Sequence, residues 1–319
     1  MSDPAIDFFG VLSESRRILT AHSRHFLALS VLFLLPLSFF LIAAPTFLAS
    51  LRSDTNHAET LLRYAPPSKT PTLSKTLFLS LAYAAATLFL SLSAIASVTS
   101  SVRHGFFGRP VKLFSALRSL SSSLWRLLLT STAALAALAS ISLLSSIVIF
   151  TAVRSLSVLD LRSAYVVALV LIAFGAIYLQ GNWALAPVVV VVELSWGVEP
   201  LRRSAFLIKG FRRVAVALGL FFALGVGLML RLSFFGGEGP GLGWRRELPI
   251  AQTALASAVM MLLLLYALAA NAVLYMYCKA VKGELAGEIA AEFDREYVSL
   301  PFDEQKKPLI VSVTEQAQI

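Results

Sequence analysis

Six long stretches of this chain carry no Asp, Glu, Lys or Arg, and they constrain its fold more than any other feature. Between their flanking charged residues these stretches contain 27, 27, 27, 30, 17 and 31 residues. A helix needs about 20 mostly apolar residues to cross the hydrocarbon core of a bilayer. The pattern predicts an all-α fold, a polytopic membrane helix bundle with six transmembrane helices. The expected spans are residues 26–50, 77–99, 127–151, 164–192, 214–235 and 251–277.

The fifth stretch is the shortest, and composition supports the interpretation of the whole set. It lies between Arg213 and Arg231, and it reaches Phe235 if the Arg231 side chain extends to the membrane surface. The chain is 57% hydrophobic and only 14% charged, whereas soluble domains are about 25% charged. No strand-like alternation argues for a β-barrel. The first stretch follows a polar N-terminus and is longer than a signal-peptide core, so we expect a retained span.

The distribution of Lys and Arg predicts the orientation of these spans. Of the 27 basic residues, 18 lie in the N-terminus, the second and fourth connections and the C-terminal tail, and 9 lie in the other connections. Because cytosolic loops are enriched in Lys and Arg, we expect both termini in the cytosol. The predicted organisation is an N-terminal segment at residues 1–25, a transmembrane domain at 26–277 and a cytosolic tail at 278–319.

Short, basic and amphipathic segments precede the first, third and fifth spans. Apolar residues recur there at helical spacing with Arg or Lys between them, which is typical of helices that lie in the headgroup layer. We expect these interfacial helices to bind anionic lipid headgroups on the cytosolic side. The simpler alternative is that they only connect spans and set the topology. The basic residues expected to face lipid are Arg16, Arg17, Arg118, Arg202, Arg203, Lys209, Arg212 and Arg213.

Polar residues interrupt the fourth span at Gln180 and Asn182, and Pro187 follows them. Proline has no amide hydrogen, so this helix is expected to kink near Trp183. The freed carbonyl groups could line a small polar cavity beside Gln180 and Asn182, with Asn271 of the sixth span as a partner. The alternative is ordinary hydrogen bonding between helices.

Other local signals concern the first spans and the connections. Pro36 and Pro45 are expected to bend or break the first span. Ser and Ala are dense in the second and third spans, which favours close packing within one chain, with a homo-oligomer face as the alternative. Residues 52–76 contain three prolines and predict an extended loop. The Gly-rich residues 236–248 predict a linker, because they lack the context of a phosphate-binding loop.

Residue types that usually carry chemistry are missing from the expected spans. No Asp, Glu, Lys or His lies deep inside any of them, and proton-coupled transporters usually need such residues. The four histidines lack metal-ligand spacing, and no nucleophile–base–acid set is recognisable. The net charge of +9 is not accompanied by a nucleic-acid recognition module. We therefore expect no enzymatic activity, no metal or cofactor and no nucleic-acid partner.

The C-terminal tail differs from the rest of the chain because its acidic residues outnumber its basic ones. Apolar residues spaced four apart predict an amphipathic helix over Val281–Tyr297. Tyr297 and Leu300 have the spacing of a tyrosine-based sorting signal. Cys278, at the expected membrane edge, is a candidate for palmitoylation, with a plain interface thiol as the alternative.

The segment that follows the fourth span resembles a known family. An apolar run ends in Glu, and a Gly, a basic-Ser pair and a Lys-Gly pair follow; these residues are Glu193, Gly197, Arg203, Ser204, Lys209 and Gly210. At this spacing the segment is similar to a family of uncharacterised six-pass membrane proteins of land plants, which Phe9–Pro36 and Tyr277–Tyr297 also fit. More distantly it is similar to the membrane domain of some bacterial glycerophosphodiester phosphodiesterases. The resemblance implies a fold and no activity, because the plant family has no known reaction, and we do not expect the phosphodiesterase activity here.

Two functions from different classes follow from these patterns. The first is a non-enzymatic protein of the endomembrane system or plasma membrane that organises lipids or partner proteins, or that takes part in trafficking. The second is a small-solute transporter or channel that uses the polar part of the fourth span. The first depends on the basic segments, and the second depends on Gln180, Asn182 and Asn271.

Overall fold

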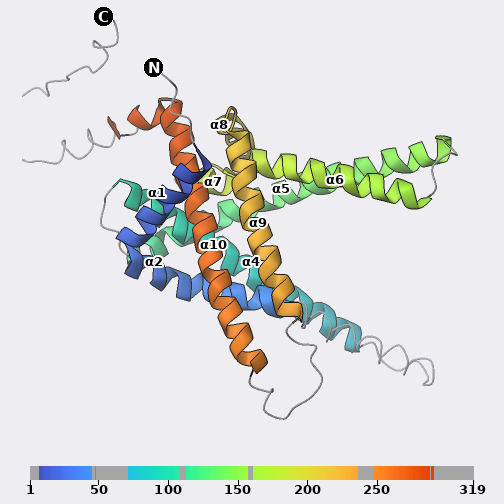
Figure 1. Cartoon of the computed structure of the whole chain (residues 1–319), viewed down its shortest axis with the longest axis horizontal. Coiled ribbons are helices and arrows are strands. Elements are labelled where there is room, and N and C mark those ends of the chain that lie inside the picture. Colours follow the sequence, from blue (N-terminus) through green and yellow to red (C-terminus); the bar gives the residue numbers. More distant parts are fainter. Residues whose placement is uncertain are drawn as a thin grey trace, which may run out of the picture. The chain divides into compact units, whose positions relative to one another are not determined.

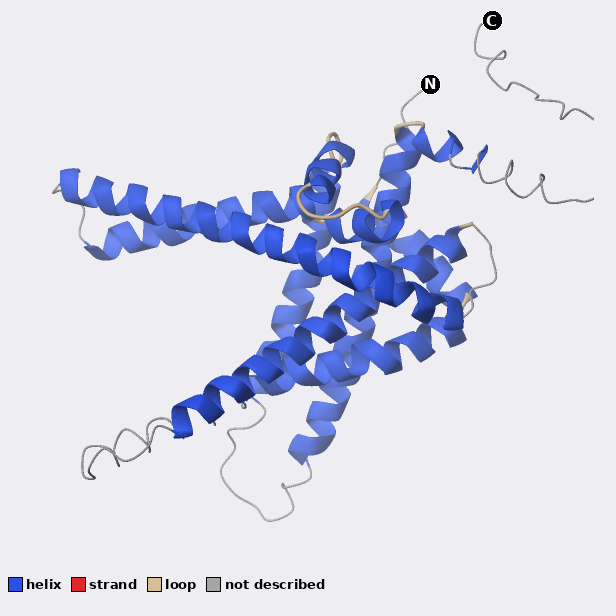
Figure 2. Ribbon diagram, turned by 180° about the vertical axis from the view of Figure 1, so that it is seen from behind, coloured by secondary structure: helices blue, strands red, loops and turns tan. Residues whose placement is uncertain are grey.

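The computed structural model describes residues 7–44, 47, 71–107, 113–156, 161–235, 248–287 and 289–290. Helices make up nearly all of this part, and it contains no strand (Figures 1 and 2). Six of its helical segments are long and apolar enough to cross a membrane. The predicted all-α fold with six candidate transmembrane helices is therefore confirmed.

The six apolar segments lie close to the expected spans, at Ser23–Ala44, Leu77–Phe106, Ser123–Ile147, Ile172–Glu193, Arg212–Ser233 and Gln252–Val281. Many of their bulky apolar side chains face outward. In the third segment, Leu135, Leu143 and Leu144 are each more than 60% exposed. Water disfavours that much exposed hydrocarbon, whereas lipid accepts it. The chain is therefore an integral membrane protein. Its elements are α1 (Phe8–Ala21), α2 (Ser23–Leu29), η1 (Ser30–Leu34), α4 (Pro71–Phe106), α5 (Leu113–Leu156), α6 (Leu161–Trp183), α7 (Ala186–Glu193), α8 (Glu199–Leu207), α9 (Arg212–Phe235) and α10 (Leu248–Val281).

The N-terminal helix α1 packs on other helices through one face. Val11, Ser15 and Ile18 are buried on this face, at the helical spacing of four and three residues. α1 contacts α4 and α9, and a methyl group on Gly105 of α4 would meet the Ile18 side chain at 3.1 Å. This face of α1 therefore lies against neighbouring helices, and contact of the segment with lipid stays a prediction.

The first span changes its hydrogen-bonding pattern just before Pro36. The five-residue π-helix η1 ends at Leu34, and helix continues beyond it to Ala44. Because proline cannot donate a backbone hydrogen bond, a wider turn in front of it accommodates the missing bond. Pro36 therefore distorts the span without ending it, and Pro45 lies outside the described residues.

Helices α4 and α5 are longer than a bilayer is thick. They contain 36 and 44 residues, about 54 and 66 Å at 1.5 Å per residue. Residues 71–76 belong to α4, so the prediction of an extended loop over 52–76 is wrong for these six residues. The reason is that Pro71 is the first residue of α4, a position that suits proline. Residues 52–70 lie outside the described residues. Arg118 lies in α5, which has no Gly or Pro, so the segment before the third span is continuous with that span.

The fourth span is divided at the predicted place. Helix α6 ends at Trp183, Ala184 and Leu185 form a turn, and α7 begins directly before Pro187. The Val189 N–H then donates to the Leu185 carbonyl at 2.9 Å. The expected kink near Trp183 is therefore confirmed, because Pro187 removes one donor from the helix at this point.

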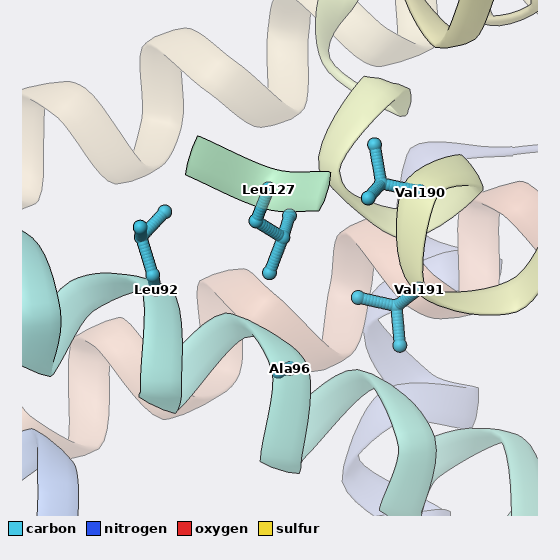
Figure 3. Close-up of a cluster of buried hydrophobic side chains, with 5 residues drawn as sticks. All are labelled: Leu92, Ala96, Leu127, Val190 and Val191. Carbon is cyan, nitrogen blue, oxygen red and sulfur yellow. The ribbon is translucent and has the colours of Figure 1, made fainter. Parts of the chain in front are cut away.

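Buried apolar side chains fasten α7 to α4 and α5 (Figure 3). The cluster combines one small residue with four branched ones, so the helices approach closely and their side chains fill the space between them. α7 is thereby held in place, and it positions the segment that follows. The cluster consists of Leu92, Ala96, Leu127, Val190 and Val191.

Residues 1–278 form one compact unit, and residues 279–319 form a second. In the second unit α10 ends at Val281, Gly283 has a φ angle of 74°, and helix resumes over residues 284–287. The single helix predicted over Val281–Tyr297 is therefore interrupted, because a left-handed glycine ends a helix. Residues 236–247 and those from 291 onward, including Tyr297 and Leu300, lie outside the described residues.

Candidate lipid-interface site around helix α8

The chain reverses direction sharply between α7 and α8. Leu194 has a φ angle of 56° and Gly197 one of 77°, both in the left-handed region. This conformation suits glycine but is unfavourable for leucine. The guanidinium of Arg126 in α5 donates a hydrogen bond to the Leu194 carbonyl. A contact from another helix therefore helps to hold the unfavourable turn.

Glu193, the last residue of α7, is the centre of a polar network. Nε of Arg203 in α8 donates to both carboxylate oxygens, at 3.2 and 3.3 Å. The hydroxyl of Tyr275 in α10 donates to Oε1 at 2.9 Å. The Arg203 and Glu193 side chains are 29% and 21% exposed, and Tyr275 is fully buried. The network joins three helices through one carboxylate at the end of an apolar span.

A second hydrogen bond fastens α8 to the end of α6. The Ser204 hydroxyl donates to the Asn182 backbone carbonyl at 2.7 Å, and both residues are buried. Leu201 and Leu207 are buried on the same side of α8. The side-chain oxygen of Asn182 has no hydrogen-bond partner within the described residues. One side of α8 is thus fixed to the protein, and the other is left exposed.

The exposed side of this segment combines aromatic, aliphatic and basic side chains. Trp196, Val198 and Phe206 are 63%, 68% and 53% exposed. Arg202, Phe206 and Lys209 follow one another at helical spacing of four and three residues, and Arg213 is exposed at the start of α9. Apolar and basic groups side by side are typical of a surface that lies at the boundary between headgroups and acyl chains. We call this set the α8 surface: Trp196, Val198, Arg202, Phe206, Lys209 and Arg213.

Arg203 and Arg212, also expected to face lipid, are engaged with protein groups. Arg203 contacts Glu193, as described above, and its guanidinium lies 5.8 Å from the centre of the Phe206 ring. Arg212 donates to the Tyr178 hydroxyl at 3.3 Å and lies 5.6 Å from the centre of that ring. Arg212 is exposed as well, but its guanidinium contacts Tyr178, which leaves Arg202, Lys209 and Arg213 for the α8 surface.

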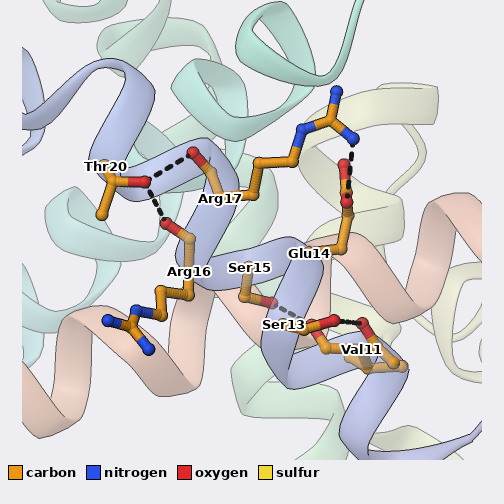
Figure 4. A network of polar contacts seen from close by, with 8 residues as sticks. Val11, Ser13, Glu14, Ser15, Arg16, Arg17 and Thr20 are labelled. Carbon is orange, nitrogen blue, oxygen red and sulfur yellow. Dashed lines mark hydrogen bonds and ion pairs between the residues drawn. The ribbon is translucent and has the colours of Figure 1, made fainter.

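The basic residues of α1 are exposed, but they lie on a different element. Nη1 of Arg17 pairs with the Glu14 carboxylate at 3.4 Å, while Arg16 points in another direction (Figure 4). An exposed pair three residues apart contributes little to stability. The side chain of Arg118 lies outside the described residues. The structure thus gathers the basic residues around α8 and leaves Arg16 and Arg17 on a separate helix.

The polar residues expected inside the membrane are only partly brought together. Gln180 and Asn271 line the same cavity of about 400 Å³, which lies mainly between α6 and α9 and also includes Leu138 of α5, Pro187 of α7 and Asn271 of α10. Asn182 is not among the residues that line it. Gln180 and Asn271 thus line the same cavity, and the expected pairing of Asn271 with the fourth span stays a prediction.

Other polar contacts were not foreseen from the sequence. His25 Nε2 and Ser101 Oγ lie 3.0 Å apart and join the first span to α4. The Ser38 hydroxyl donates to the Ser257 carbonyl at 2.8 Å and joins the first span to α10. A dense distribution of serine signals close packing but does not identify which helices meet. No group of His, Cys, Asp and Glu that could hold a metal occurs in the part of the chain that was described.

Six apolar helices with outward-facing hydrocarbon, and polar networks at helix ends, define a polytopic helical membrane protein. Residues 4–293 match the family described as a domain of unknown function (DUF8558), and the chain belongs to that family. No curated protein matches the chain, and no solved structure does.

Proposed function

We propose that this protein is a non-enzymatic membrane-organising protein whose α8 surface binds anionic lipid headgroups on the cytosolic face of an endomembrane or the plasma membrane. The observation that carries the proposal is the composition of the α8 surface. Trp196 and Phe206 suit the membrane boundary, and Arg202, Lys209 and Arg213 suit the phosphate layer.

The attachment of α8 to the rest of the protein supports this role. Ser204 and Arg203 hold its inner side through Asn182 and Glu193, so the exposed side is presented in a fixed position. Each basic residue near an anionic surface contributes about 1 kcal/mol of attraction. The twofold excess of Lys and Arg supports a cytosolic location for this side of the bundle and for both termini. The proposal has a further part: Tyr297 and Leu300 form a tyrosine-based sorting signal, as in a protein that takes part in trafficking.

The test replaces three basic side chains of the α8 surface. The variant Arg202→Gln/Lys209→Gln/Arg213→Gln, full-length and in detergent, is titrated with short-chain phosphatidylserine or phosphatidylcholine, and bound lipid is counted by native mass spectrometry. We expect phosphatidylserine binding to weaken roughly a hundredfold, since about 1 kcal/mol is lost at each of the three positions, with phosphatidylcholine unaffected.

The matched control removes the same charge from connections expected on the opposite side, as Arg63→Gln/Arg245→Gln/Arg246→Gln. It should bind phosphatidylserine as the unaltered protein does. If both variants lose phosphatidylserine binding equally, net charge alone explains the effect. If the α8 variant loses no binding, the proposal is refuted.

Transport of a small solute is our second candidate. It rests on the cavity beside Gln180. We place it second because Asn182, the other polar group expected along such a path, is not among the residues that line the cavity.

A further inference from the structure

The cavity between α6, α9 and α10 has polar groups on otherwise apolar walls. Its volume is about 400 Å³, within the range of small-molecule sites. Gln180 and Asn271 supply carboxamides, and the apolar wall includes Leu138, Ile177 and Leu220. None of the residues that line it is charged. These features distinguish it from a plain apolar groove between helices.

Two glycines show that this space is built into the packing of α6 and α9. A methyl group on Gly181 would lie 2.5 Å from a methyl of Val216, so the two helices meet there at the closest approach that a glycine allows. Gly219, on the next turn of α9, also lines the cavity, and a methyl group on it would meet nothing within 4 Å. The helices therefore touch at one turn and leave room at the next.

The carboxamides of Gln180 and Asn271 are not paired with one another or with other described residues. Within the described residues neither Gln180 nor Asn271 makes a hydrogen bond, although both belong to apolar spans. Asn271 is half-buried and Gln180 is exposed, so both are reachable from the cavity. Lipid tails offer no hydrogen bonds, and polar side chains in apolar spans are retained where something pairs with them.

We propose that the cavity binds a neutral amphiphile, with a hydroxyl- or amide-bearing head on Gln180 and Asn271 and a hydrocarbon part along the apolar wall. Each carboxamide both donates and accepts hydrogen bonds, which matches such a head. An uncharged lining offers no counter-ion to a phosphate or an ammonium group. This site is separate from the α8 surface, and it takes an uncharged ligand where that surface takes anionic headgroups.

The experiment uses the full-length protein in nanodiscs and a photoactivatable, alkyne-bearing monoacylglycerol. We expect the probe to label peptides of α6, α9 or α10. Unlabelled monoacylglycerol should compete at least tenfold better than the lysophosphatidic acid with the same chain. Gln180→Leu/Asn271→Leu should reduce labelling at least fivefold. Gly219→Leu should do the same by filling the cavity, and the first carbon of its side chain meets no atom within 4 Å.

The matched control is Gln252→Leu, which removes a carboxamide from α10 outside the cavity and should leave labelling unchanged. Each variant is checked for monodisperse elution, and Gly219→Leu provides an independent readout if the double variant does not fold. The proposal is overturned if labelling persists in both cavity variants or if the phosphate-bearing lipid competes equally. It is also overturned if a cross-linker placed at Gln180 captures a second copy of the chain in this space.

Discussion

At the scale of single residues, the carboxylate of Glu193 shows how a charge is accommodated at the end of an apolar helix. Arg203 neutralises it and Tyr275 donates to it, so its lone pairs are used where hydration is incomplete. A partly buried ion pair of this kind adds little net stability compared with apolar groups, but removing one partner is costly. The pair therefore sets the position of α8 more than it adds to overall stability.

We predict that Arg203→Gln destabilises the protein by about 1–2 kcal/mol, because Glu193 then remains charged and less well paired. Thermal unfolding in detergent, followed by tryptophan fluorescence, measures the change. Glu193→Gln should destabilise it similarly, and the double variant should lose less than the sum of the two. Strictly additive losses would show that the two side chains do not act as a pair.

Sequence reasoning singled out Arg203 as a lipid contact, and it did not find the carboxylate network. Tyr275 lies 82 positions from Glu193, and no local pattern connects residues so far apart. Exposed Arg202 and Lys209 could be recognised from helical spacing alone, because exposure on a short helix is a local property. Which basic residues turn inward depends on neighbours that only the fold supplies.

At the scale of elements, the contact between α6 and α9 depends on the absence of a side chain at Gly181. A methyl group there would lie 2.5 Å from Val216, closer than carbon atoms approach without displacement. Small residues at such positions let transmembrane helices pack by close backbone contact. Gly175, two turns earlier in α6, has nothing within 4 Å of the same position.

We predict that Gly181→Ala lowers the melting temperature, because it pushes α6 away from α9. Gly175→Ala on the same helix is the matched control, and it should be neutral or stabilising, since alanine favours a helix by roughly 1 kcal/mol over glycine. Adding Val216→Ala to Gly181→Ala should restore part of the loss by removing the methyl that clashes. If both glycine variants melt alike, the close contact does not contribute to stability.

Element boundaries were predictable where their cause is local. Pro187 divides the fourth span because proline lacks a donor wherever it occurs in a helix. The continuity of α5 was harder to predict. The amphipathic segment and the third span differ in composition, but both have helical backbone conformation. No Gly or Pro separates them, and a helix without a stop signal continues.

At the scale of the whole molecule, the bilayer explains why six spans could be predicted from charge gaps alone. Lipid excludes charge and requires every backbone group to be paired within its own helix, so span and helix coincide. The cavity beside Gln180 could not be predicted in this way, because its walls come from segments far apart in the chain. The distribution of Lys and Arg predicts the orientation of the spans in the membrane, which the arrangement of helices alone does not reveal.

We predict that single cysteines at Gly108 and Ser312 react with an impermeant maleimide in sealed microsomes, whose outer face is cytosolic. Cysteines at Asn56 and Gly241 should react only after permeabilisation. The background is Cys278→Ala, and Cys278 itself is buried. The basis is the 18-to-9 distribution of Lys and Arg. The opposite labelling pattern would invert the topology and move the α8 surface to the lumenal side.

The length of the helices bears on which membrane suits this protein. The apolar segments Leu77–Phe106 and Gln252–Val281 contain 30 residues each, about 45 Å of helix at 1.5 Å per residue. The hydrocarbon layer is about 27 Å thick in the endoplasmic reticulum and about 32 Å in the plasma membrane. Helices of this length tilt or distort the bilayer less as the membrane thickens. Hydrophobic matching therefore predicts a smaller distortion in a thicker bilayer, whichever membrane holds the protein.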